Sequence, residues 1–392
     1  MQSSEIVYEG ADRRILGNSG GEDRLYLEIS DHYSIFDWGR MPDSIANRGR
    51  ALSIIAAHIF EHLENPETWQ HTALSPALKP IRSDWLERRW NHLVFCHLLA
   101  EHGAPTHYRA LVGPDGKPLS MKEAAASAQP VLLDILKSRY LVPRKVVLLE
   151  QPLFFYPPPE PDGARFHVPL EFVFRFGIAP GDPLTGRLMT DRTYRQAHGL
   201  ERQPEASGLF DRPVLEFYSR LEPNRRLLDL REALLISGLT PGHLEEAIEL
   251  SYNIALALLA LFAAKGLALW EGKLEYVAGP DGLRLADSIG PDCLRLFYEG
   301  TEVGDGFLRN AYAGTTWAGT LAKARERAAR AAASSWQQFC RDDLKAAPEP
   351  LASGLKAQAD LMYGVLANHI VGRELFADHP SLAEFVASTR GS

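Results

Sequence analysis

The sequence is poor in cysteine, with three among its 392 residues, at Cys96, Cys293 and Cys340. Cysteines so few and so widely scattered form neither a disulfide framework nor a zinc site, which indicates a reducing, cytoplasmic location. His58 and His62 lie four residues apart in "HIFEH". The acid between them is not where the zinc-protease motif needs it, so we interpret the pair as one face of a plain helix.

Other absences exclude further classes of protein. Neither a GxGxxG dinucleotide motif nor a P-loop is present, and the first residues lack the apolar stretch of a secretory signal. The longest apolar run, "IALALLALFAA", is about half the length that spans a bilayer, so we expect a buried helix and no membrane partner. A formal net charge of −8 argues against a nucleic-acid partner, because phosphate backbones attract concentrated Lys and Arg.

What remains is typical of a globular protein, with 45% hydrophobic and 23% charged residues. The length exceeds that of a single core, so two lobes are expected. "EIVYEG", "RRILG" and "RLYLEIS", separated by glycine-rich turns, predict an antiparallel meander. Apolar periodicity predicts helices in "NRGRALSIIAAHIFEHLE" and "HLEEAIELSYNIALALLALFAAKG", and a helical tail.

The middle of the chain is harder to interpret. "RKVVLLEQPLFFYPPP" and "ARFHVPLEFVFRFG" each predict one strand, and residues 176–230, rich in Gly and Pro, predict loops. We divide the chain into a β-rich N-terminal lobe with a helical insertion (1–168), an α+β catalytic lobe (169–314) and a C-terminal helical extension (315–392).

A charged hairpin in residues 271–295 is the clearest chemical feature. Glu271, Lys273 and Glu275 alternate with uncharged residues, so a strand would project all three from one face. The turn "GPDG" then returns the chain toward Asp287. Mg²⁺ prefers one or two carboxylates together with phosphate oxygens and water, and a lysine can offset charge on a transferred phosphoryl group. A solvated strand face with ordinary ion pairs is the alternative.

Several blocks, in order over roughly residues 5–310, resemble the SAICAR synthetase (phosphoribosylaminoimidazole-succinocarboxamide synthase) family. "IVYEGADRRIL" is similar to its Y-x-G-K-x-K hairpin, and "SDHYSIFDWGRMPDSIANRGRALS" to its S-D-R-x-S-A-F-D…K-G stretch. "VPLEFVFRFG", "PVLEFYSRLE" and "EGKLEYV…LRLADSIGPDCLRL" occupy the places of the later motifs.

This resemblance implies a two-lobed α+β fold, with an N-terminal antiparallel sheet and ATP in the cleft between the lobes. It implies ATP-dependent amide formation, in which a substrate carboxylate becomes an acyl phosphate that an amine displaces. ATP and Mg²⁺ would be the cofactors, and a small-molecule carboxylate and an aspartate-like amino acid the substrates. We expect a homodimer.

The resemblance also implies site residues. Glu275 and Asp287 would bind magnesium, and Lys273, Arg175 and Arg295 would be catalytic. The nucleotide is assigned to Gly10, Arg13, Arg14, His167, Val168, Glu171, Lys273, Glu275 and Asp287, with the backbone of His167 and Val168 meeting the adenine. The substrates are assigned to Asp31, Ser34, Asp37, Arg48, Arg175, Arg220, Glu271, Asp292 and Arg295. For Asp31 and Asp37, capping of turns is the alternative.

Departures from the family pattern fall mostly on the acceptor side. Two departures touch nucleotide handling: Ala11 replaces the first hairpin lysine, and Ser288 replaces a glutamate. On the acceptor side, Gly181 or Asp182 stands where a phosphate-binding serine belongs. A carboxylate near an expected phosphate would repel it. We therefore predict an amide ligase with a non-standard acceptor. The alternatives are the purine-pathway reaction itself, a small-molecule kinase and a non-catalytic nucleotide binder.

Overall fold

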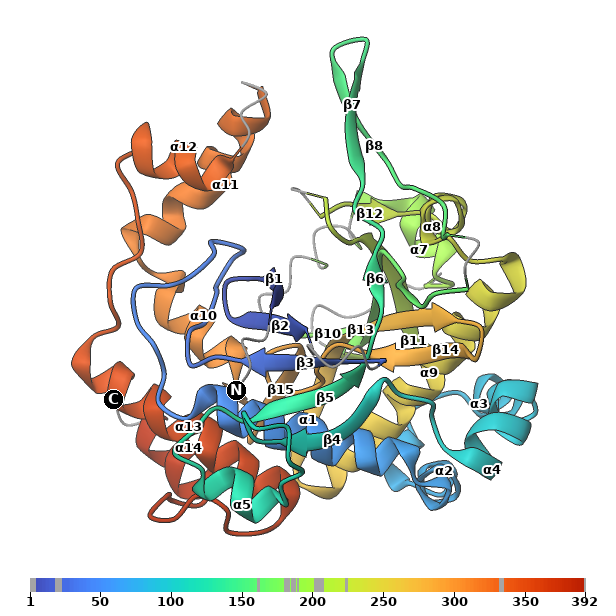
Figure 1. Ribbon diagram of the computed structural model, residues 1–392, viewed down its shortest axis with the longest axis horizontal. Coiled ribbons are helices and arrows are strands. Elements are labelled where there is room, and N and C mark those ends of the chain that lie inside the picture. Colours follow the sequence, from blue (N-terminus) through green and yellow to red (C-terminus); the bar gives the residue numbers. More distant parts are fainter. Residues whose placement is uncertain are drawn as a thin grey trace.

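Alternating apolar and polar residues near the N-terminus form the first of the two large sheets in the described part of the chain (Figure 1). The computed structural model of the chain describes residues 5–17, 23–160, 163–179, 184, 188, 190–200, 208–222, 225–330 and 335–390. The first sheet has the order β1-β2-β3-β5-β4, which confirms the predicted meander. Its strands are β1 (Ile6–Glu9), β2 (Arg13–Gly17), β3 (Arg24–Ile29), β4 (Tyr108–Val112) and β5 (Leu132–Leu136).

The second sheet forms the centre of the other lobe, in the order β12-β11-β10-β13-β15-β16. The long strand β13 also pairs with β14 and β9, and β9 pairs with β6. Its strands are β6 (Arg139–Tyr140), β9 (Phe166–His167), β10 (Leu170–Ile178), β11 (Gly208–Ser219), β12 (Leu227–Leu228), β13 (Leu267–Gly279), β14 (Gly282–Ala286), β15 (Leu294–Tyr298) and β16 (Thr301–Val303).

The predicted charged hairpin is confirmed as β13 and β14. Gly279 pairs with Gly282 at the turn, and Gly282 has φ +90°, a conformation that suits glycine. Glu275 pairs with Ala286. Asp287 therefore follows directly after the residue opposite Glu275.

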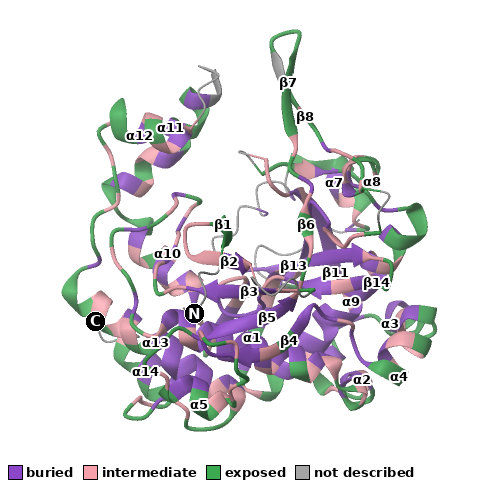
Figure 2. Cartoon of the chain, viewed as in Figure 1, coloured by how far each residue is buried: buried purple, intermediate pink, exposed green. Residues whose placement is uncertain are grey.

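Long apolar helices cover the sheets. Helix α9 (Pro241–Ala264) begins with Thr240 capping the His243 N–H and Pro241 in the first turn, as predicted. By length and composition α9 could cross a membrane, but most of it is buried inside the protein, which confirms a core helix (Figure 2). Helix α1 (Arg48–Glu64), also predicted, packs along helix α13 (Ser353–Val371), so the end of the chain completes the core beneath the first sheet (Figure 1).

The helical insertion and the helical tail are both confirmed. The shorter helices are α2 (Pro66–Ala73), η1 (Pro76–Leu78), α3 (Ser83–Trp90), η2 (Val94–Leu99), α4 (Ala100–His102), α5 (Met121–Ala126), α7 (Arg192–Ala197), α8 (Leu230–Ser237), α10 (Asp305–Ala313), α11 (Thr316–Arg330), α12 (Trp336–Asp342) and α14 (Leu382–Arg390).

Two local predictions are wrong. The segment predicted as one strand is a two-stranded hairpin of β7 (Arg144–Leu148) and β8 (Gln151–Phe155), which projects from the body (Figure 1). Its turn residues Leu149 and Glu150 have φ of 48° and 64°, positions where Asn or Gly is usual, so the sequence carries no turn signal. Residues 176–230, predicted as loops, contain the twelve-residue strand β11.

Some elements cross the predicted domain boundaries. The first sheet ends at Leu136, and β6 and β9 already belong to the second sheet although they precede residue 168. The contact between α13 and α1 likewise joins the extension to the N-terminal lobe.

Candidate functional site

One face of the second sheet is charged because alternating residues of its strands point to the same side. Glu171 and Arg175 of β10 share this face with Lys273 of β13, which lies beside Val173 in the register. The intervening Phe172 and Phe174 are fully buried on the opposite face. The sequence thus gives one face to the core and leaves the other for polar chemistry.

Five side chains form what we call the sheet-face cluster: Glu171, Arg220, Arg225, Lys273 and Glu275. The Arg220 guanidinium donates to Glu275 at 3.0 Å, and the Lys273 ammonium lies 3.6 Å from a Glu171 oxygen. Arg225 pairs with the same Glu171 and stacks over the Tyr218 ring. The cluster brings the charges of the β13 hairpin together with charges from neighbouring strands.

The electrostatics of this cluster are those of closely spaced opposite charges. Glu171 raises the pKa of Lys273 to about 12, so the ammonium stays charged. Burial raises the pKa of Glu275, and the negative charges of Asp287 and Glu171 raise it further. The positive charges of Arg220 and Lys273 lower it, but they do not outweigh the rise. Oxygen Oε1 of Glu275 is buried without a hydrogen-bond partner among the described residues. Glu275 is therefore an acid held in a site that does not fully compensate its charge.

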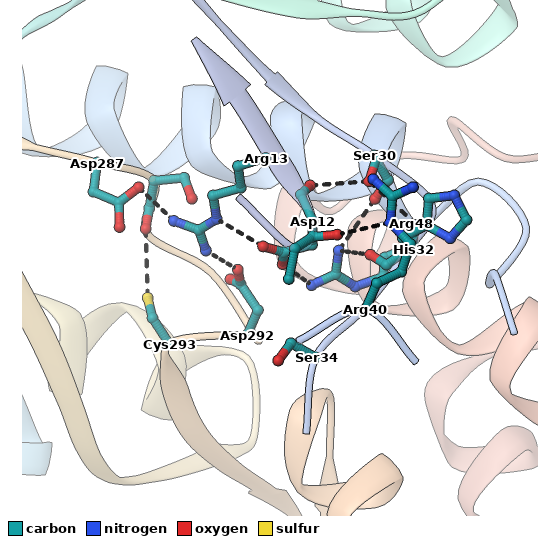
Figure 3. A network of polar contacts seen from close by, with 12 residues as sticks. Asp12, Arg13, Ser30, His32, Ser34, Arg40, Arg48, Asp287, Asp292 and Cys293 are labelled. Atoms are coloured by element: carbon teal, nitrogen blue, oxygen red, sulfur yellow. Dashed lines mark hydrogen bonds and ion pairs between the residues drawn. The ribbon is translucent and has the colours of Figure 1, made fainter. Parts of the chain in front are cut away.

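A second group, the lobe bridge, joins the two lobes through Asp12, Arg13, Arg48, Asp287 and Asp292 (Figure 3). Arg13 of β2 donates to both Asp287 and Asp292 from the other lobe. Arg48 pairs with Asp12 at 2.9 Å. Burial pushes the pKa of Asp287 upward, but Arg13, Arg220 and Lys273 outweigh it and hold that pKa below its usual range.

Asp287 is held in an uncommon backbone conformation, with φ +63°. Nε2 of His107 donates to the Asp287 carbonyl oxygen at 2.8 Å, and burial lowers the pKa of His107 to about 4, so the ring is neutral. His107 precedes β4, so the first lobe fixes the backbone that carries the Asp287 carboxylate.

The two arginines predicted to face the acceptor are neutralised by carboxylates. Arg175 donates to Glu216 at 2.7 Å and also pairs with Glu271, while Arg295 donates to Glu302 at 2.8 Å. Such pairs reduce the charge that each arginine offers an anionic ligand.

A cavity of about 430 Å³ borders the sheet-face cluster. Glu171, Arg220 and Arg225 line it on the sheet side, and Arg325 and Trp336 of the C-terminal extension line it on the other. The extension is tied to the loop after β3 because Arg325 pairs with Asp37 at 3.3 Å. The cavity thus has walls from both the catalytic lobe and the tail.

Several predicted site residues have structural contacts instead. Arg14 lies on the other side of β2 from Arg13 and donates to Glu28 at 2.7 Å. The Asp31 carboxylate accepts from the Gly49 N–H at 2.9 Å in the first turn of α1, and the Ser34 hydroxyl accepts from the Gly39 N–H at 3.3 Å. These contacts favour the turn-capping alternative for Asp31.

Arg48 is buried and donates to the carbonyl oxygens of Ser30 and His32, so it holds the loop after β3. Gly10 donates its N–H to the Arg13 carbonyl at 2.8 Å and thereby closes the turn between β1 and β2. Positions 181 and 182, predicted to replace the phosphate-binding serine, lie outside the described residues.

The segment predicted to contact adenine, His167 and Val168, already forms contacts within the protein. The Val168 N–H donates to the Tyr276 carbonyl at 2.9 Å, so in this structure it offers no donor to a base. His167 is buried and stacks on Tyr140, with ring centroids 4.6 Å apart. The role of these two residues toward a nucleotide stays a prediction.

Sequence reasoning missed Asp12, His107, Tyr140 and Arg225. Each lies in a segment that is distant in sequence from the charged hairpin, so no local spacing of residues predicts its place in the site. Arg225 lies three residues beyond the end of the block "PVLEFYSRLE", outside the quoted motifs.

The donor set fits a magnesium ion that is shared with a phosphate ligand. Mg²⁺ usually takes one or two protein carboxylates and completes its shell with phosphate oxygens and water. Glu275 offers a buried oxygen without a partner, and Asp287 stays ionised. Within the described ranges no group of three or more His, Cys, Asp or Glu is placed to hold a metal ion.

These features define a two-lobed α+β protein whose lobes meet at an ion-pair network beside a charged sheet face. A family model, SAICAR synthetase, matches residues 165–311, which include both strands of the charged hairpin. This matched region belongs to the SAICAR synthetase family, as the sequence had indicated.

Individual proteins extend the likeness beyond that region. An Archaeoglobus fulgidus protein inferred to be a phosphoribosylaminoimidazole-succinocarboxamide synthase is 26% identical over 92% of each chain. The synthase of that name from Thermoplasma acidophilum is 30% identical over 43% of this chain and 59% of its own. The fold resembles the SAICAR synthase of Saccharomyces cerevisiae, solved with SAICAR, with a TM-score of 0.54 and 15% identity over 95% and 96% of the two chains.

Proposed function

We propose that this protein is an ATP-dependent, ADP-forming ligase that joins a small-molecule carboxylate to the amine of an aspartate-like amino acid. The observation that carries the proposal is the convergence of Lys273, Glu275 and Asp287 with Arg13 of the other lobe. Membership of the family supports it, since the relatives carry the name of such a synthase. A cytoplasmic location belongs to the proposal.

The chemistry requires the phosphates of ATP to be neutralised and held in line with the attacking carboxylate. Glu275 and Asp287 would hold Mg²⁺, which offsets phosphate charge. Lys273, charged at all ordinary pH values, would add a second positive group. Because Arg13 already pairs with Asp287, the bridge must rearrange when Asp287 takes up a metal.

Activation gives an acyl phosphate on the carboxylate substrate, with ADP leaving. The amine then attacks the acyl carbon, phosphate leaves and an amide remains. Water must be excluded while the acyl phosphate exists. The C-terminal extension, which contributes Arg325 and Trp336 to the cavity wall, is suited to shielding that region.

For the acceptor we propose a carboxylate that does not depend on a ribose phosphate. Arg175 and Arg295 are paired with Glu216, Glu271 and Glu302. Two arginines so neutralised would bind a phosphate dianion weakly. The second candidate is the purine-pathway acceptor, the carboxylated aminoimidazole ribonucleotide, which the Archaeoglobus fulgidus relative favours because it aligns over 92% of both chains.

The test is a phosphate-release assay with Mg-ATP and aspartate, comparing the ribonucleotide acceptor with its dephosphorylated riboside. Equal turnover of the riboside supports the proposed acceptor, whereas dependence on the phosphate restores the second candidate. A kinase would form ADP and a stable phosphorylated product, and it would release no free phosphate. Absence of any stabilisation by Mg-ATP in a thermal-shift assay would refute nucleotide chemistry altogether.

A further inference from the structure

The hairpin of β7 and β8 exposes an unusual amount of apolar surface. It projects from the body, and seven large apolar side chains in and beside it are 49% to 88% exposed (Figures 1 and 2). A two-stranded hairpin by itself is marginally stable in water, and exposed apolar patches of this kind mark interaction surfaces. The seven are Val142, Val146, Val147, Leu148, Leu149, Leu153 and Phe155.

The apolar residues are concentrated on one face. Val146 pairs with Leu153 and Arg144 with Phe155, so Val146, Leu153 and Phe155 point to the same side. Leu148, two residues after Val146, joins them. The opposite face carries Lys145, Val147 and the half-buried Phe154.

The edges of the hairpin resist the addition of another strand. The two-residue loop makes Leu148 and Gln151 the closing hydrogen-bonded pair, so the next pair, Val147 and Pro152, directs its backbone groups outward. Pro152 has no N–H to offer there, and Lys145 lies on the other edge strand. Proline and lysine at edges oppose strand addition, so an interface must use the apolar face.

We propose that the apolar face of this hairpin, formed by Val146, Leu148, Leu153 and Phe155, packs against the same face of a second copy of the chain. Without Val147, which points to the opposite face, the exposed apolar residues amount to about 600 Å² on ordinary residue areas, against the roughly 800 Å² that each partner contributes to a standard interface. A homodimer arm of this kind goes beyond the ligase activity, because it assigns the hairpin between β6 and β9 a role in assembly.

The ends of the hairpin are complementary under two-fold symmetry. Leu149 at the tip is 88% exposed and Val142 at the base is 63% exposed. In an antiparallel arrangement each tip lies on the partner's base, so Leu149 contacts Val142 and Val142 contacts Leu149, as an isologous interface requires. The left-handed backbone at Leu149 costs about 1–2 kcal/mol, and a contact formed by its side chain in a dimer would offset part of that cost.

Sedimentation velocity on the full chain tests the proposal, with Leu148→Glu on the apolar face and Val147→Glu as the matched control. Val147 lies on the same strand and is similarly exposed, but it points to the opposite face. The wild type should sediment as a dimer at micromolar concentration. Leu148→Glu should raise the dimer dissociation constant by about 100-fold or more, since each dimer would bury two substituted carboxylates within the interface. Val147→Glu should dimerise as the wild type does.

A monomeric wild type would overturn the proposal and assign the hairpin to a different partner. Dimerisation of Leu148→Glu as tight as that of the wild type would also overturn it, because the dimer would then use another surface. Hydrogen exchange of unsubstituted protein gives an independent measurement. The amides of residues 144–155 should become more protected as concentration rises, and protection that is independent of concentration would count against the proposal.

Discussion

Replacing Glu275 by Gln should stabilise the protein while abolishing its activity. Glu275 is buried, one of its oxygens has no hydrogen-bond partner in the described part of the chain, and burial raises its pKa. A buried acceptor without a partner costs about 1–3 kcal/mol. Glutamine keeps an oxygen for Arg220, which donates to Glu275 at 3.0 Å, and its NH2 group can donate to the neighbouring acids. We expect a gain of about 1 kcal/mol.

The gain should depend on pH with a definite sign. A group whose pKa is raised on folding contributes stability below its unfolded value and loses it as pH rises through the folded value. Wild-type Glu275 therefore destabilises the fold most at a pH well above 4.5, the ordinary pKa of a glutamate. The stability advantage of Glu275→Gln should be larger at pH 8 than at pH 5, measured as a difference in thermal midpoint of about 2 °C at the higher pH.

The matched control is Glu216→Gln on the neighbouring strand. Glu216 is also buried, but its oxygens accept from Arg175 at 2.7 Å and Tyr194 at 3.0 Å. This substitution weakens satisfied bonds, so the midpoint should fall. A lower midpoint for Glu275→Gln, or a gain that is the same at pH 5 and pH 8, would refute the argument. Turnover of Glu275→Gln should drop by about 100-fold or more if the carboxylate holds magnesium.

The remaining predictions concern the same site. Lys273→Ala and Asp287→Asn should each abolish turnover and leave the circular dichroism spectrum unchanged; loss of folding would instead make the charged hairpin structural. Since Glu171 raises the pKa of Lys273 to about 12, the rate should show no loss from lysine deprotonation up to about pH 10, and a falling limb assigned to Lys273 below that pH would contradict the ion pair. His107→Gln retains a donor for the Asp287 carbonyl, so it should keep most of the thermal stabilisation by Mg-ATP. His107→Leu has no such donor and should lose that stabilisation. Equal stabilisation of the two variants by Mg-ATP would show that the hydrogen bond does not position Asp287.

Local patterns predicted the parts of the fold whose periodicity is strong. Alternation of charges predicted the β13–β14 hairpin, and Thr240 followed by Pro241 predicted the start of α9. The β7–β8 hairpin was missed because its turn uses Leu149 and Glu150 in left-handed conformations without a glycine. A rule based on turn composition could not find it.

The site was only half predictable, for a different reason. Lys273, Glu275 and Asp287 lie close together in sequence, so a single hairpin brings them near one another. Arg13 pairs with Asp287 across 274 positions, and His107 reaches it across 180. Ordered motifs of the family supplied Arg13, but nothing in the local sequence connects His107 to the acid that it holds.

The packing of α13 along α1 has a consequence for how the protein is made. Helix α1 leaves the ribosome early, but the surface against which it is buried is not complete until residues 353–371 have been synthesised. The N-terminal lobe must therefore wait, with an apolar helix uncovered, for nearly the whole chain. A premature stop just before residue 353 would damage the first lobe as severely as a lesion in that lobe, and a nascent chain of this protein is expected to depend on chaperones until α13 has been synthesised.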